Sequence, residues 1–129
     1  MTKQDIRMIV DMVVPNCKVT FGRGEGCYCR PSFLNAPQVI NIDFEQLRKI
    51  WRGGKGFGKF KKNLKLRGFD MSSFSTMVKG VTLHEVAHAR QHEEWPLEMF
   101  ESITRQFGEV TAYCEVVADR YARIIGRQI

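Results

Sequence analysis

The sequence predicts a small α+β fold in which a three-stranded sheet packs on a central helix and a C-terminal helix. Three short segments between turns that contain glycine or proline are strand candidates, and the second of them begins with the alternating run Cys27-Tyr28-Cys29. These are residues 18–21, 27–33 and 39–42. Later segments repeat apolar side chains at spacings of three and four, as helices do. The chain has 129 residues, of which 43% are hydrophobic, so we predict a single domain, 1–129, with its own core.

The helices are predicted from their capping residues and apolar faces. Thr2 and Asp5 form a capping-box pattern at the start of a helix over residues 2–14, and Asp43 is a plausible N-cap for a second helix that ends at Gly53. The central helix begins after Ser72 or Ser73 and contains Gly80, which predicts either a break or a close approach to the sheet. Further helices are predicted over residues 97–107 and 109–125.

The central helix carries the motif His84-Glu85-Val86-Ala87-His88. Histidines four residues apart on a helix lie about 6 Å apart along its axis, so both can hold one metal ion. Glu85 can take a proton from a metal-bound water, which is the chemistry of the H-E-x-x-H motif. A polar surface helix is the alternative, but small apolar residues separate the histidines. We therefore predict a Zn²⁺ site.

A catalytic zinc site needs a third protein ligand and an open fourth position. His92 is the remaining histidine, but on a continuous helix it lies about 12 Å from His84, too far to share one ion. Glu115 and Asp119 share a face of the last predicted helix. We predict that Glu115 is the third ligand and that Asp119 accepts the spare ring N–H of a ligand histidine. The alternative for this pair is a solvated helix face.

The two motifs, HEVAH at 84–88 and EVVAD at 115–119, resemble the H-E-x-x-H and E-x-x-x-D pattern of the gluzincin zinc metallopeptidases. The run Glu115–Ile125 is similar to the second active-site helix of the ImmA/IrrE-like family, and the short sheet before the HExxH helix is more loosely similar to SprT-like domains. The resemblance covers about Ser72–Ile125. It implies a minimal zincin-like fold and hydrolysis of a protein or peptide substrate, with Glu85 as the general base.

Residues 48–67 contain nine Lys or Arg and no Asp or Glu. The whole chain has a net charge of +6, so the other 109 residues together have a net charge of −3, and the basic character is local. Repeated glycines beside Phe57 and Phe60 predict a flexible cationic loop at about 52–68. Such a loop could contact phosphates and stack bases, attract an acidic substrate, or simply be solvated. The lysines concerned are Lys55, Lys59, Lys61, Lys62 and Lys65. The alternative function is therefore a nucleic-acid-associated or regulatory zinc-binding protein with little or no proteolysis.

The cysteines and the N-terminus indicate the compartment. No apolar run approaches the length of a membrane span and no signal peptide is recognised, so we predict a cytoplasmic protein with reduced thiols and no membrane partner. Cys17, Cys27 and Cys29 could form a second metal site, but their spacing is not that of a common zinc knuckle, and half-buried sheet cysteines are favoured. The candidates for stabilising an oxyanion are Tyr113, Tyr121, Arg120, Arg123 and His92.

Overall fold

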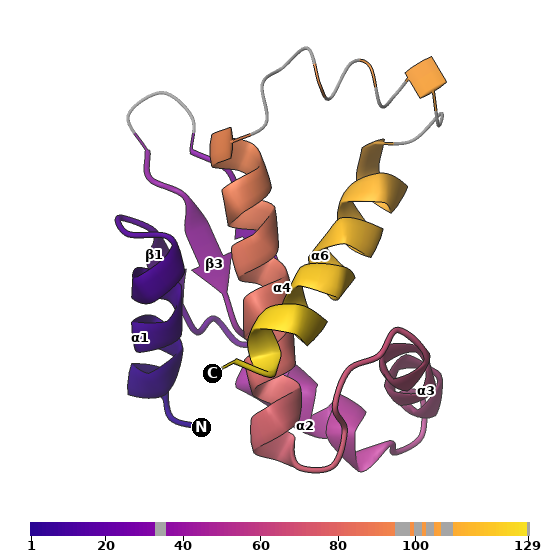
Figure 1. Cartoon of the computed structure of the whole chain (residues 1–129). Helices are drawn as coiled ribbons and strands as arrows, with labels where there is room; N and C mark the ends of the chain where they lie inside the picture. Colours follow the sequence, from indigo (N-terminus) through magenta and orange to yellow (C-terminus); the bar gives the residue numbers. More distant parts are fainter. Residues whose placement is uncertain (33–35, 95–98, 100–101, 103–104, 107–109, 129) are drawn as a thin grey trace.

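A computed structural model describes the chain except residues 33–35, 95–98, 100–101, 103–104, 107–109 and 129. The described part contains five helices and a three-stranded sheet, which confirms the predicted α+β class (Figure 1). The elements are α1 (Lys3–Val13), β1 (Lys18–Thr20), β2 (Tyr28–Arg30), β3 (Val39–Asn41), α2 (Phe44–Arg52), α3 (Gly58–Leu66), α4 (Phe74–Glu94) and α6 (Val110–Gly126). Most of the helix predicted over residues 97–107 lies outside the described residues. Among the described helices, none combines the length and the apolarity needed to cross a bilayer.

The sheet is mixed and has the order β1-β3-β2. β3 is buried throughout, pairs in parallel with β1 and pairs antiparallel with β2, so that Ile40 faces both Val19 and Cys29 across the ladders. The prediction that β2 continues to residue 33 is wrong, because the strand ends at Arg30. The next residue is Pro31, which has no N–H to donate to a strand ladder.

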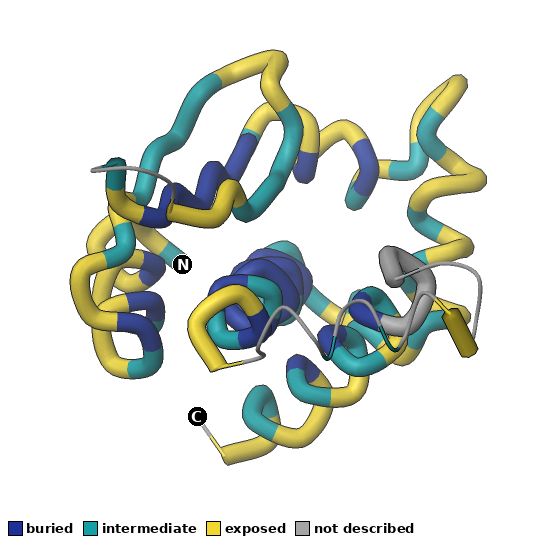
Figure 2. The backbone as a smooth tube through the Cα atoms, turned by 90° about the horizontal axis from the view of Figure 1, so that it is seen from above, coloured by how far each residue is buried: buried dark blue, intermediate teal, exposed yellow. Residues whose placement is uncertain are grey.

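Helix α4 forms the centre of the molecule, between the sheet and α6 (Figure 1). Viewed almost end-on in Figure 2, it carries much of the buried surface, and 11 of its 21 residues are buried. Gly80 neither breaks this helix nor approaches the sheet. A Cβ atom at Gly80 would instead lie 3.0 Å from the ring of Phe69, so the glycine makes room for that ring.

One buried amide organises the glycine-rich turn between β1 and β2. Asn41, at the end of β3, is fully buried. Its Oδ1 accepts from Thr20 Oγ1 and from the backbone N–H of Gly22, both at 2.7 Å, and its Nδ2 donates to the carbonyls of Gly22 and Gly26. Asp43 caps α2 as predicted, because its carboxylate accepts from the backbone N–H of Gln46 at 3.1 Å. The capping box at the start of α1 is also confirmed.

The basic segment is more ordered than predicted, because the expected loop contains helix α3. Gly53 ends α2 and Gly56 turns the chain, both with positive φ, so the glycines are concentrated in one short connection. Helix α3 has no buried residue, and within the described structure it packs mainly against α2. Lys61 lies over the ring of Trp51, 5.6 Å from its centroid, and this contact fixes one face of α3.

Candidate metal centre

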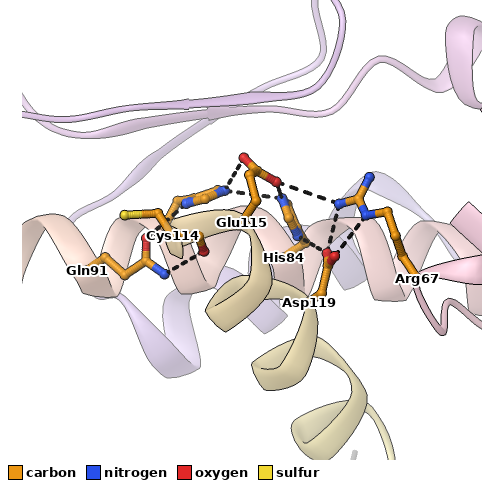
Figure 3. Close-up of polar contacts among 7 residues, drawn as sticks. Arg67, His84, Gln91, Cys114, Glu115 and Asp119 are labelled. Carbon is orange, nitrogen blue, oxygen red and sulfur yellow. Dashed lines mark hydrogen bonds and ion pairs between the residues drawn. The ribbon is translucent and has the colours of Figure 1, made fainter. Parts of the chain in front are cut away.

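Three predicted ligands converge between α4 and α6 (Figure 3). His84 Nε2 lies 2.9 Å from Glu115 Oε2, His88 Nε2 lies 3.0 Å from Glu115 Oε1, and the two Nε2 atoms lie 3.1 Å apart. Within the described residues, this is the one group of three His, Cys, Asp or Glu side chains close enough to hold a metal ion. The structure therefore contains a site that could bind a metal.

The packing of α6 on α4 explains why the carboxylates meet the imidazoles. Cys114, Ala118 and Ala122 recur every four residues along α6 and are all buried. Their small side chains allow the two helices to approach closely, and these helices share the most extensive packing in the described structure. Glu115 and Asp119 each follow one of these buried residues and so lie beside the same interface.

The hydrogen bonds around His88 indicate which ring nitrogen carries its proton. Gln91 Nε2 donates to the carbonyl of Cys114 at 3.0 Å, so Gln91 Oε1 is the atom that faces His88 Nδ1, also at 3.0 Å. An amide oxygen only accepts, and His88 Nδ1 must therefore be the donor. This leaves an electron pair on His88 Nε2, directed at the other two ligands.

His84 has a carboxylate in the corresponding position. Its Nδ1 is buried and makes no aligned hydrogen bond, but Asp119 Oδ1 lies 2.8 Å away. A carboxylate at that distance favours a proton on Nδ1 and again leaves the electron pair on Nε2. This is the contact that the sequence predicts for Asp119.

The donor atoms fit a divalent metal. Two nitrogen electron pairs and a carboxylate face one another, and only a cation or an additional proton can satisfy all three. Ligand atoms of a tetrahedral zinc ion, with bonds of about 2.0–2.1 Å, lie about 3.3 Å apart. The separations of 2.9–3.1 Å are close to that value. Two histidines and one glutamate are also a known donor set of catalytic zinc.

Without a metal, a proton fills this role. Burial lowers the pKa of His88, but its hydrogen bonds to Glu115 and Gln91 and the charges of Glu115 and Glu85 together leave that pKa above the ordinary value. Hydrogen bonds from His84 and His88 hold the pKa of Glu115 well below its usual range. A proton and a metal ion therefore compete for the same atoms.

The charge balance also favours a divalent cation. Glu85, Glu115 and Asp119 are three carboxylates, and among the described residues Arg67 is the guanidinium that pairs with Glu115 and Asp119, so the ionised site with neutral imidazoles carries a net charge of −2. Glu85 is buried, and burial raises the pKa of its carboxyl group, whereas the two imidazoles lower it. Burial and the charge of Glu85 together raise the pKa of Cys29 on β2 to about 12.

Two residues at the site were missed by the sequence analysis, Arg67 and Gln91. Gln91 follows His88 by three residues on the same helix, and this spacing could have indicated it. Arg67 precedes Asp119 by 52 residues, and no sequence pattern joins them.

The other candidates do not join the ligand group. His92 is exposed and lies outside it, as predicted. Cys17, Cys27 and Cys29 are free and partly buried, as predicted, but only Cys29 lies in a strand, and Cys17 and Cys27 each directly precede one. Arg120 and Arg123 are exposed, and the Tyr113 side chain lies outside the described residues.

None of the protein-family models, curated proteins or solved structures compared with this chain matches it. The resemblance to gluzincins therefore depends on the two motifs alone and stays a prediction. What the structure adds is the convergence of His84, His88 and Glu115.

Proposed function

We propose that this chain is a zinc-dependent metallopeptidase of the gluzincin type, which hydrolyses peptide bonds with Glu85 as general base. One observation carries the proposal: the electron pairs of His84 and His88 and the carboxylate of Glu115 converge within about 3 Å, and the charges of all three act on the buried carboxyl group of Glu85. A purely structural metal site would not need this additional buried acid next to its ligands.

Each residue has a distinct role in the proposed reaction. His84, His88 and Glu115 would hold the ion, which when bound would activate a water and polarise the scissile carbonyl. Glu85 would act as the general base and then as the general acid toward the leaving amine, and its raised pKa suits a group that must both accept and donate a proton. The Glu115 side chain is 43% exposed, so the substrate would approach from the α6 side.

Metal analysis and a peptidase assay test the proposal. Purified wild type is expected to contain about one zinc per chain, lost in Glu115→Ala and kept in His92→Ala, because His92 is outside the ligand group. Glu85→Gln should keep the metal yet cleave a proteome-derived peptide library at least about 100-fold more slowly. Glu94→Gln, at the exposed end of the same helix, is the matched control. Equal cleavage by Glu85→Gln and wild type would refute the peptidase proposal.

The second candidate is a nucleic-acid-associated or regulatory zinc-binding protein, and α3 is the observation that favours it. This helix has no buried residue, and it exposes Phe60 by 57% and Leu66 by 78% among its lysines. Exposed aromatic and cationic side chains are what single-stranded nucleic acid binds. The acidic-substrate role of the same lysines stays a further proposal.

Neutralising the lysines separates the two candidates. We would replace Lys59, Lys62 and Lys65 by Gln and measure binding of a fluorescent single-stranded oligonucleotide between about 50 and 200 mM salt. A nucleic-acid function predicts that wild type binds, that affinity falls steeply with salt, and that the triple variant loses binding. If the wild type shows no salt-dependent binding, or if biological activity survives in the triple variant but not in Glu85→Gln, the nucleic-acid candidate is excluded.

A further inference from the structure

Arg67 is the residue through which the basic segment reaches the metal centre. It is the C-cap residue of α3, and its side chain is 31% exposed. Arg67 Nε donates to Asp119 Oδ2 at 2.8 Å, and Nη2 donates to Asp119 Oδ1 at 2.7 Å. This two-bond arrangement fixes the plane of the carboxylate as well as its position.

The same carboxylate contacts a metal ligand. Asp119 Oδ1, which accepts from Arg67, lies 2.8 Å from His84 Nδ1, and Arg67 Nη2 also lies 3.6 Å from Glu115 Oε2 (Figure 3). One guanidinium therefore touches two carboxylates, of which one is a ligand and the other orients a ligand. Without Arg67, Asp119 is free to rotate away from the histidine.

Phe69 holds Arg67 from the other side. The Arg67 guanidinium carbon lies 5.2 Å from the centroid of the Phe69 ring, and this ring lies 6.0 Å from the ring of His84. Gly80 leaves room for Phe69 on α4. The Phe69 ring is thus a neighbour of both the Arg67 guanidinium and the His84 imidazole.

We propose that Arg67 is a positioning residue of the metal centre: its guanidinium fixes Asp119 against Nδ1 of His84, so that Nε2 of His84 keeps its electron pair for the metal. The proposal rests on the metal centre of the proposed function but does not depend on peptide hydrolysis. It assigns to Arg67 a role that depends on geometry. The competing interpretation is that Arg67 supplies only a positive charge.

The two interpretations predict opposite effects on metal binding. A positive charge beside a divalent cation opposes it, so an arginine that acted by charge alone would weaken binding, and its removal would strengthen binding. A positioning arginine strengthens binding, and residues that orient ligands typically contribute about 10- to 100-fold in affinity. Lysine keeps the charge but cannot form the two parallel hydrogen bonds.

The test compares Arg67→Lys and Arg67→Met with wild type by titration of Zn²⁺ against a competing chelator. We expect both variants to bind zinc at least about 10-fold more weakly. Arg120→Met, an exposed arginine beside Asp119 on the same helix, is the matched control and should bind like wild type. Unchanged affinity in Arg67→Lys, or tighter binding in Arg67→Met, overturns the proposal.

A second measurement needs neither metal nor activity. Long-range ¹H–¹⁵N spectra of the metal-free protein, at a pH where the imidazoles are neutral, identify the tautomer of His84. We expect a proton on Nδ1 in wild type and an increased population of the Nε2–H tautomer in Arg67→Lys. If the tautomer is unchanged, Arg67 does not position His84, whether or not the chain is a peptidase.

Asp119→Asn covers the case in which Arg67→Met fails to fold. The double variant Arg67→Lys/Asp119→Asn should bind zinc no more weakly than whichever single variant binds it more weakly, because the two residues act through one contact. Additive effects would show that Arg67 and Asp119 act separately, which also overturns the proposal. If the wild type cleaves no peptide but the zinc-binding and tautomer results are as expected, the peptidase proposal is refuted and the positioning role of Arg67 is retained.

Discussion

Replacing Glu115 by glutamine is the most direct test of the metal centre. The substitution keeps the shape of the side chain but exchanges a charged ligand, 2.9 and 3.0 Å from the two histidines, for a neutral amide. Zinc sites with four ligands bind with about 10–16 kcal/mol, so one ligand contributes about 3 kcal/mol. This corresponds to a dissociation constant about 150-fold larger.

The same free energy can be read as a change in thermal stability. A protein of 129 residues unfolds with an entropy of about 0.27 kcal/mol/K. When zinc saturates both proteins, 3 kcal/mol of lost binding reduces the zinc-induced increase in Tm by about 11 °C. The assay is thermal unfolding followed by circular dichroism, with and without zinc at one fixed excess.

Glu45→Gln is the control, because Glu45 is an exposed carboxylate on α2 that pairs with Lys49 at 3.4 Å. It should show the full zinc-induced increase of wild type. If zinc raises the Tm of Glu115→Gln as much as that of wild type, Glu115 is not a ligand, and the assignment of the site is wrong.

Three further outcomes are expected. Below the raised pKa of His88, zinc affinity should rise about tenfold per pH unit, because binding displaces one proton, and a flat titration would contradict this. The stability of the metal-free protein should change with pH in the opposite direction. The free energy of folding contributed by protonated His88 is present at low pH and is lost as the pH rises through the raised pKa of His88. Asn41→Ala should cost about 2–4 kcal/mol in urea unfolding, since it leaves buried groups of the glycine turn unpaired, and a loss below about 1 kcal/mol would show that water replaces the amide. Gly80→Ala should destabilise by about 1 kcal/mol despite the better helix propensity of alanine, because its Cβ presses on Phe69, and a more stable variant would show that the ring moves freely.

The sequence predicted those parts of the site that lie on regular helices. His84, His88, Glu115 and Asp119 could be placed because each pair is four residues apart, and a helix brings such residues to one face. Arg67 could not be placed in this way, because it meets Asp119 across two separate elements, the end of α3 and helix α6. Contacts between separate elements depend on tertiary structure, which spacing along the chain does not report.

Two errors in the predicted fold have local causes. The segment before Arg67 was interpreted as a loop from its glycines, but two of them lie in the connection at Gly53 and Gly56, and the lysines and leucines that follow favour a helix. The length of β2 was overestimated because the alternation of side chains was weighted above Pro31, which ends the pairing.

The burial of α4 has a consequence for what the ion does to the chain. A metal held by His88 and Glu115 joins positions 27 residues apart, and ordering such a loop around an ion would ordinarily cost entropy. Here Leu83, Val86 and Ala118 are buried in apolar packing of the helices that carry the ligands. Such packing would distinguish a metal bound here from the ion of a zinc finger, in which the ion and the fold depend on each other. Treatment with a chelator should therefore leave the far-ultraviolet circular dichroism unchanged at room temperature, and a bound ion could exchange while the protein stays folded.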